Sequence, residues 1–133
     1  MCIRDRDYVS HHAAKAYHGH CSHAYYKAAI QYIIDRVEDP VFFVFSDDIN
    51  WCKKNLQISH PTHFVDHNSS KDAFQDLRMM SLCQHHILAN SSFSWWGAWL
   101  SLHSTSIVIS PRKWFAIDRP TSDLIPPRWK IID

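Results

Sequence analysis

A short run of amide and hydroxyl side chains, Asn90-Ser91-Ser92-Phe93-Ser94, stands directly before an aromatic helical segment. Backbone N–H groups at a helix N-terminus have no partner inside the helix, and together with hydroxyls they bind anions, most often phosphate. A single hydroxyl is enough to cap a helix, however, so Ser91 or Ser92 could serve that purpose alone. The run therefore supports two interpretations, a phosphate site or an ordinary helix cap.

Two adjacent carboxylates, Asp47 and Asp48, follow a strongly apolar segment. At the end of a strand such a pair could hold a metal ion together with nucleotide phosphates, or accept hydrogen bonds from a nucleotide. Either residue could instead cap the short helix expected to run through Trp51 to Leu56. Because no third carboxylate stands at a usable spacing, the sequence predicts no requirement for a divalent metal.

Three tryptophans, Trp95, Trp96 and Trp99, crowd the helix that follows the serines. Large aromatic side chains usually pack in a core, and we expect at least two of the three to do so. The alternative is that Phe93 or Trp95 forms a wall that faces a sugar or a base. Gly97 is expected to permit the close approach of a neighbouring backbone.

A basic residue, Arg78, lies beside Leu77 and Asp76 on another predicted helix. The default interpretation is a solvated charged face, which contributes little to stability. An arginine at this place could also reach a pyrophosphate, since its guanidinium matches phosphate geometry.

Potential zinc ligands gather near the N-terminus, where His18, His20, Cys21 and His23 stand close together. No second pair stands at the spacing of a zinc finger. With 11 histidines in the chain, chance clusters of this kind are expected. A structural zinc site is therefore an alternative rather than the main hypothesis.

Strand and helix segments alternate along the chain with short connections. Apolar and periodic runs indicate strands over 41–45, 63–66, 86–89 and 106–109, and helices over 22–37, 51–56, 72–83 and 93–102. This alternation predicts a Rossmann-like α/β domain with parallel strands and right-handed crossovers. Ligands then bind beyond the C-terminal ends of the strands, where 46–48 and 90–94 fall. Residues 4–8 join them if they end an earlier strand.

Several apolar side chains are expected to anchor this domain. On the helix over 72–83, the spacing predicts that Phe74, Leu77 and Met80 face the core. Trp114 and Trp129, with Phe115, are expected to anchor the Pro-rich segment after the last strand.

Length and composition set the class of the protein. The chain has 133 residues, of which 46% are hydrophobic, enough for one domain with a buried core. A net charge of +1 does not favour nucleic acid as a partner. The 2 glycines exclude a Gly-rich phosphate loop, and the 4 widely spaced cysteines fit a reduced compartment.

The N-terminal residues and the absence of long apolar runs lead to further predictions. Without a visible signal peptide or a long apolar run, we expect a cytoplasmic protein. Residues 1–6 read like a translated adapter string, so they are treated as a non-native or truncated start. Residues 7–133 are then expected to form a single nucleotide-sugar-binding domain.

Residues 90–100 resemble the signature of the bacterial α-1,2-fucosyltransferases, glycosyltransferase family 11. Segments 43–48, 76–81, 85–87, 107–115 and 129–131 are also similar to family segments, in family order. The family's His-x-Arg-Arg-Gly-Asp-Tyr motif, linked to the GDP-fucose diphosphate, corresponds here to Cys-Ile-Arg-Asp-Arg-Asp-Tyr. Asp7 and Tyr8 match this motif, Arg4 matches its first arginine by position, and Asp5 and Arg6 differ from it.

The resemblance implies inverting transfer of L-fucose from GDP-β-L-fucose to the 2-hydroxyl of a terminal galactose, with no metal cofactor. It implies a GT-B-like fold, of which this chain would be the C-terminal, donor-binding half and inactive alone. Loose association with the inner face of the plasma membrane extrapolates from the family. The alternatives are a nucleotide-sugar-binding fragment without catalysis and a His/Cys zinc module.

The resemblance and the residue patterns together define the candidate site. Asp7 is the candidate general base, and Phe93 and Trp95 are the candidate wall of the sugar pocket. The candidate donor-binding residues are Arg4, Asp47, Asp48, Arg78, Asn90, Ser91, Ser92 and Ser94.

Overall fold

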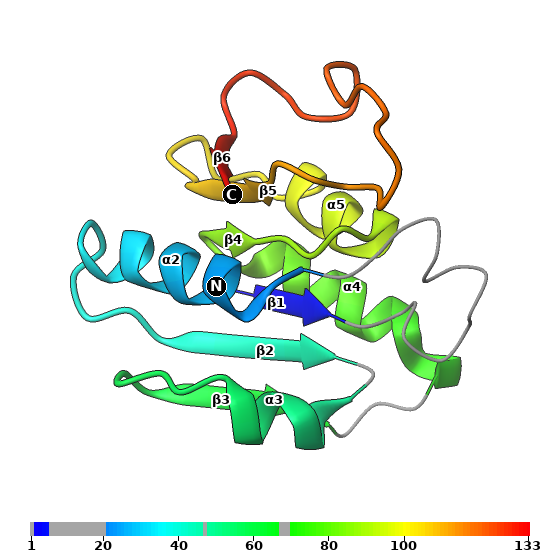
Figure 1. Cartoon of the computed structure of the whole chain (residues 1–133). Helices are drawn as coiled ribbons and strands as arrows, with labels where there is room; N and C mark the ends of the chain where they lie inside the picture. The colour runs from blue at the N-terminus through cyan, green and yellow to red at the C-terminus, as the bar shows by residue number, and fades with distance from the viewer. Residues whose placement is uncertain (1, 6–20, 47, 67–69) are drawn as a thin grey trace.

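The computed structural model describes residues 2–5, 21–46, 48–66 and 70–133, which build a parallel sheet with helices packed on it (Figure 1). The strands are β1 (Cys2–Asp5), β2 (Phe42–Ser46), β3 (Thr62–Val65), β4 (His86–Ile87), β5 (Val108–Pro111) and β6 (Lys130–Ile132). The helices are α2 (His23–Ile34), α3 (Ile49–Asn55), α4 (Ala73–Leu82) and α5 (Ser92–Trp99), with a 3-10 turn at Ser70–Asp72.

The strand order is β3-β2-β1-β4-β5-β6, and every neighbouring pair is parallel. Ile3 of β1 lies opposite Val44 on one side and Ile87 on the other, so β1 is the centre of the sheet. The chain moves outward through β2 and β3 and then returns to start β4 beside β1. This confirms the predicted Rossmann-like topology, whose ligand crevice lies where the strand order reverses.

Alternating side chains of the strands divide the core between two faces. Phe42 and Val44 of β2 pack with α2 and α3, whereas Phe43 and Phe45 pack toward α4. The chain thus forms three layers, with α2 and α3 on one face of the sheet and α4 and α5 on the other (Figure 1). None of the helices in the described residues has the length and apolarity that crossing a bilayer demands.

Helix α2 begins at its predicted cap, and its Tyr25 side chain reaches the carboxyl end of β4. The Ser22 hydroxyl accepts a hydrogen bond from Tyr25 N at 3.0 Å. The Tyr25 hydroxyl donates to the carbonyl of Leu88 at 2.6 Å, just beyond β4. The helix ends at Ile34, three residues before the predicted end, and the chain turns through Asp39, which has a φ of 48°.

The four predicted strands are present, with shifted ends, and two further strands join them. β1 lies within residues 1–6, where the sequence offered an earlier strand only as a condition, and β6 was not predicted. β6 has only three residues, and its pairing with β5 is a long-range contact that periodicity does not reveal. The prediction for Phe74 is wrong, because its side chain is 62% exposed. Six helical positions separate Phe74 from the buried Met80, which places the two side chains about 120° apart around α4. The predicted anchors Trp114 and Trp129 are buried, and Phe115 packs against them.

Gly97 lies where α5 packs against Met80 of α4. A Cβ at this position would lie 2.9 Å from Met80 Cε and 3.0 Å from Met80 Cβ. The close neighbour is therefore a side chain of the adjacent helix and not the backbone that the sequence suggested. A larger residue therefore requires the fully buried Met80 to shift.

We expect Gly97→Val to lower the free energy of unfolding by about 1–3 kcal/mol, because it overpacks this contact. In a Met80→Ala background the same change should cost less, since the clashing atoms are gone. Urea denaturation of the two single variants and the double variant measures this coupling. Equal losses in both backgrounds would show that Met80 is not the obstacle.

Candidate functional site

The start of α5 lies just beyond β4 at the point where the strand order reverses. Ser91 is the N-cap: its hydroxyl accepts from Ser94 N at 3.2 Å and donates to Ser94 Oγ at 3.1 Å. Ser94 Oγ lies 2.9 Å from the carbonyl oxygens of both Ala89 and Ser91. Ser91 and Ser94 are buried, so the fold itself uses both hydroxyls, while Ser92 is exposed. Of the three serines, Ser92 alone presents its hydroxyl at the surface.

The two neighbouring serines make a direct test of the cap. Ser91→Ala should lower the free energy of unfolding by about 0.5–2 kcal/mol, because it removes the partner of an N–H at the helix start. Ser92→Ala should change it by less than about 0.5 kcal/mol, as expected at an exposed position. Thermal or urea denaturation of both variants checks this, and equal effects would contradict the assignment of the cap.

Asn90 joins three segments at this edge of the sheet. Its Oδ1 accepts from Cys21 Sγ at 3.5 Å, and its Nδ2 donates to the carbonyl of Trp114 at 3.2 Å. The side chain is 95% buried, so its amide holds the start of α2 and the segment after β5 against the end of β4. Asn90 was predicted to bind the donor. In the structure its amide links the elements that border the site.

The carboxylate of Asp48 caps α3, where its Oδ1 accepts from Trp51 N at 3.0 Å. Its backbone N–H donates to Ser46 Oγ at 3.0 Å. Asp48 follows β2, which ends beside β1, so it lies at the same sheet edge as α5. The capping interpretation therefore holds for Asp48, while Asp47 lies outside the described residues.

The remaining candidates are spread over the fold. Arg4 is in β1, opposite Phe45, one residue before the end of that central strand. Arg78 is exposed on α4, where its carbonyl accepts from the Ser81 hydroxyl at 2.7 Å. Asp7, the candidate base, lies outside the described residues.

The tryptophans of α5 form a cluster on its flank. Trp95 stacks on Trp99 with 5.0 Å between ring centroids, and its Nε1 donates to the carbonyl of Leu124 at 2.7 Å. Trp96 and Trp99 are 49% and 45% exposed, so the expectation that two of the three are core residues is wrong. The small residues of α5, Ser94, Gly97 and Ala98, take the buried positions instead. A short helix that packs closely on its neighbours has no room there for indole rings.

Phe93 and Trp95 do not share one wall. Phe93 packs with the cluster of Phe45 and Met80, whereas Trp95 packs with Trp129 and its neighbours. Residues two apart on a helix point in different directions, which separates the two rings.

The candidate zinc ligands are only partly described, because His18 and His20 lie outside the described residues. Cys21 bonds Asn90, and His23 Nε2 lies 2.6 Å from the carbonyl of Asn55. Within the described part of the chain no three His, Cys, Asp or Glu side chains are grouped as a metal site.

A pocket that the sequence did not single out lies in the loop after β5. It has a volume of about 580 Å³, and residues 112–121 line it. The signal in the sequence was the density of basic residues, Arg112, Lys113 and Arg119, directly after a strand. Trp114, whose carbonyl bonds Asn90, is part of its lining, which connects the pocket to the start of α5.

A parallel sheet with this strand order, and with a capped helix at its switch point, is a Rossmann-like α/β fold. The chain belongs to glycosyl transferase family 11, whose family model matches residues 1–133. Members of this family are glycosyltransferases, and the named relatives are enzymes of this class.

Two bacterial relatives and one human relative illustrate the match. The chain is 43% identical to the alpha-1,2-colitosyltransferase of Escherichia coli, over 98% of this chain and 46% of the relative. It is 44% identical to the O-antigen biosynthesis glycosyltransferase WbnK of Escherichia coli, over 86% of this chain and 38% of the relative. Human galactoside alpha-(1,2)-fucosyltransferase 1 is 25% identical, over 77% of this chain and 30% of the relative. The chain thus spans less than half of each relative, and no solved structure matches it.

Proposed function

We propose that this chain forms the donor-binding part of a galactoside α-1,2-L-fucosyltransferase with a GT-B-like fold. The enzyme would transfer fucose from GDP-β-L-fucose to the 2-hydroxyl of a terminal galactose with inversion. The observation that carries the proposal is the capped start of α5 at the switch point of a parallel sheet, in a chain of family 11. The names of the colitosyltransferase and of the human fucosyltransferase share the α-1,2 linkage.

The chemistry of the transfer requires that the leaving nucleoside diphosphate be stabilised as negative charge develops on it. The positive N-terminal end of α5 and the exposed residue Ser92 suit a phosphate oxygen. A residue that accepts the proton of the acceptor hydroxyl completes the reaction, and Asp7 is the residue we nominate.

The donor sugar is less well supported than the linkage, because the relative at 43% identity is named a colitosyltransferase. A colitosyl donor is therefore the second candidate. We expect the 133-residue chain to bind the nucleotide without transferring sugar, since positioning an acceptor and excluding water need a second domain.

A chimera tests this proposal most directly. This chain would replace the matched segment of the Escherichia coli colitosyltransferase, and the product would be assayed with GDP-fucose and with the colitosyl donor on lactose. Transfer of fucose to the galactose 2-hydroxyl is the expected result. Transfer of colitose alone would overturn the fucose assignment, and a folded chimera inactive with both donors would overturn the donor-binding role.

The same chimera tests the metal requirement. Asp48 already caps α3, and among the described residues no three acidic, His or Cys side chains are grouped as a metal site. We expect transfer to survive treatment with a chelator. A loss of activity that added Mg²⁺ or Mn²⁺ restores would contradict this expectation.

A further inference from the structure

The loop over residues 112–121 leaves the sheet at the C-terminal end of β5, the edge at which α5 begins (Figure 1). Its pocket of about 580 Å³ is within the usual size of a small-molecule site. Three basic residues and one acidic residue, Asp118, belong to the lining. The pocket is thus positively charged, and its lining residue Trp114 is bonded to Asn90 of the candidate site.

Buried contacts of Trp114 hold the backbone of this loop against the rest of the fold. Trp114 is 96% buried, its carbonyl accepts from Asn90, and its Nε1 donates to Ser110 Oγ at 3.0 Å. Phe115 packs against the same cluster as Trp129. Since Asn90 directly precedes the cap of α5, one side chain links the loop to the helix start.

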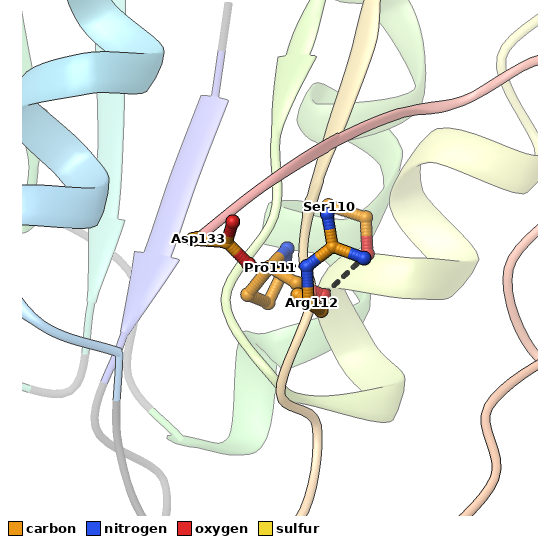
Figure 2. A network of polar contacts seen from close by, with 4 residues as sticks. All are labelled: Ser110, Pro111, Arg112 and Asp133. Atoms are coloured by element: carbon orange, nitrogen blue, oxygen red, sulfur yellow. Dashed lines mark hydrogen bonds and ion pairs between the residues drawn. The ribbon is translucent and has the colours of Figure 1, made fainter.

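The basic side chains differ in what they contact. Arg112 follows Ser110 and Pro111 at the end of β5, and its Nε pairs with the carboxylate of Asp133 (Figure 2). Lys113 is exposed and makes no ion pair within the described residues. The guanidinium carbon of Arg119 lies 5.4 Å from the centroid of the Phe115 ring. Lys113 and Arg119 together therefore carry more charge than Asp118 cancels.

We propose that this pocket binds the diphosphate of the nucleotide donor, with Lys113 and Arg119 supplying positive charge beside the start of α5. Residues 89–94 contain no basic side chain, and a helix N-terminus supplies only about half a unit charge. Arg4, one residue before the end of β1, adds one positive charge at this edge of the sheet. A nucleoside diphosphate needs more compensation than that, and the adjoining loop supplies it. The inference rests on the proposed function, and it names a second part of the same site.

The test compares Lys113→Ala and Arg119→Ala with the unchanged chain, by calorimetry with GDP, UDP, inorganic pyrophosphate and guanosine. Each substitution should weaken GDP and pyrophosphate binding about tenfold or more, as expected for a charge-assisted contact. Guanosine binding should not change, because guanosine lacks the phosphates.

Matched controls exist in the chain. Arg128 lies over the Trp99 ring at 5.4 Å, the same distance as Arg119 over Phe115, and Lys130 lies 5.6 Å over Tyr32. Arg128→Ala and Lys130→Ala should leave GDP affinity unchanged. If they weaken it as much as the loop variants do, the effect is one of overall charge and the inference is wrong.

The outcomes separate this inference from the proposed function. GDP binding that is insensitive to Lys113 and Arg119 overturns the inference and leaves the donor assignment standing. Loop-dependent pyrophosphate binding with no preference for GDP over UDP supports an anion site and contradicts a GDP donor. If the unchanged chain binds neither GDP nor pyrophosphate, the inference is overturned, and the chimera still decides the proposed function.

Discussion

Trp114→Ala should lower the free energy of unfolding by about 3–5 kcal/mol, the usual cost of emptying the place of a large buried aromatic residue. Trp114 is 4% exposed and packs with Leu88, Ala98 and Trp129. Its indole N–H also bonds the fully buried hydroxyl of Ser110, which would lose that donor. Because small domains are stable by only about 5–15 kcal/mol, the variant should be close to unfolding.

Two further variants separate the causes. Trp114→Phe keeps most of the ring and removes the N–H, so it should cost less than the alanine change, about 1–3 kcal/mol. Trp96→Ala removes an indole that is 49% exposed and should also cost less. Urea denaturation followed by circular dichroism measures all three. If Trp96→Ala destabilises the chain as much as Trp114→Ala, burial is not what determines the effect.

Most of the sheet was predictable because buried parallel strands have a strong signature. The apolar run at 41–45 has no polar residue, and β2 forms there with side chains packed on both faces. β6 has three residues, too few to produce a pattern of its own. It forms because β5 offers it a free edge, which is a property of the folded chain.

The serines show why the site was only half predictable. A helix cap and a phosphate ligand both require a hydroxyl just before a helix, so the sequence could place the site without assigning each residue. What distinguishes Ser92 from Ser91 and Ser94 is burial, and burial follows from the turn that brings Ser94 back to the carbonyl of Ala89.

Residue type could not reveal the partners of Asn90 or the places of the tryptophans, for related reasons. The amide of Asn90 bonds Trp114, a contact that depends on the long-range approach of the loop after β5. The tryptophans are large and apolar, but the helix that carries them packs through its small residues. Residue type alone therefore indicated a core position for side chains that lie on the flank.

Acid should destabilise the fold through His86, whose side chain in β4 is fully buried. Burial lowers the pKa of His86 from 6.5 to about 4, positive charge on His85 and His103 adds to the shift, and a backbone hydrogen bond with Cys83 opposes it. The folded state therefore releases its proton more readily than the unfolded state does. Stability from this residue is complete above about pH 6.5 and is lost as the pH falls toward 4.

The size of this effect follows from the two pKa values. We expect the free energy of unfolding to fall by about 1.4 kcal/mol per pH unit below pH 6.5, and by about 3 kcal/mol in total near pH 4. Urea denaturation between pH 7.5 and 4.5 measures the slope, and His86→Gln should reduce it by close to one proton. His63→Gln on β3 is the control, because it removes a histidine that is exposed rather than buried. A slope that persists unchanged in His86→Gln would assign the acid sensitivity to another group.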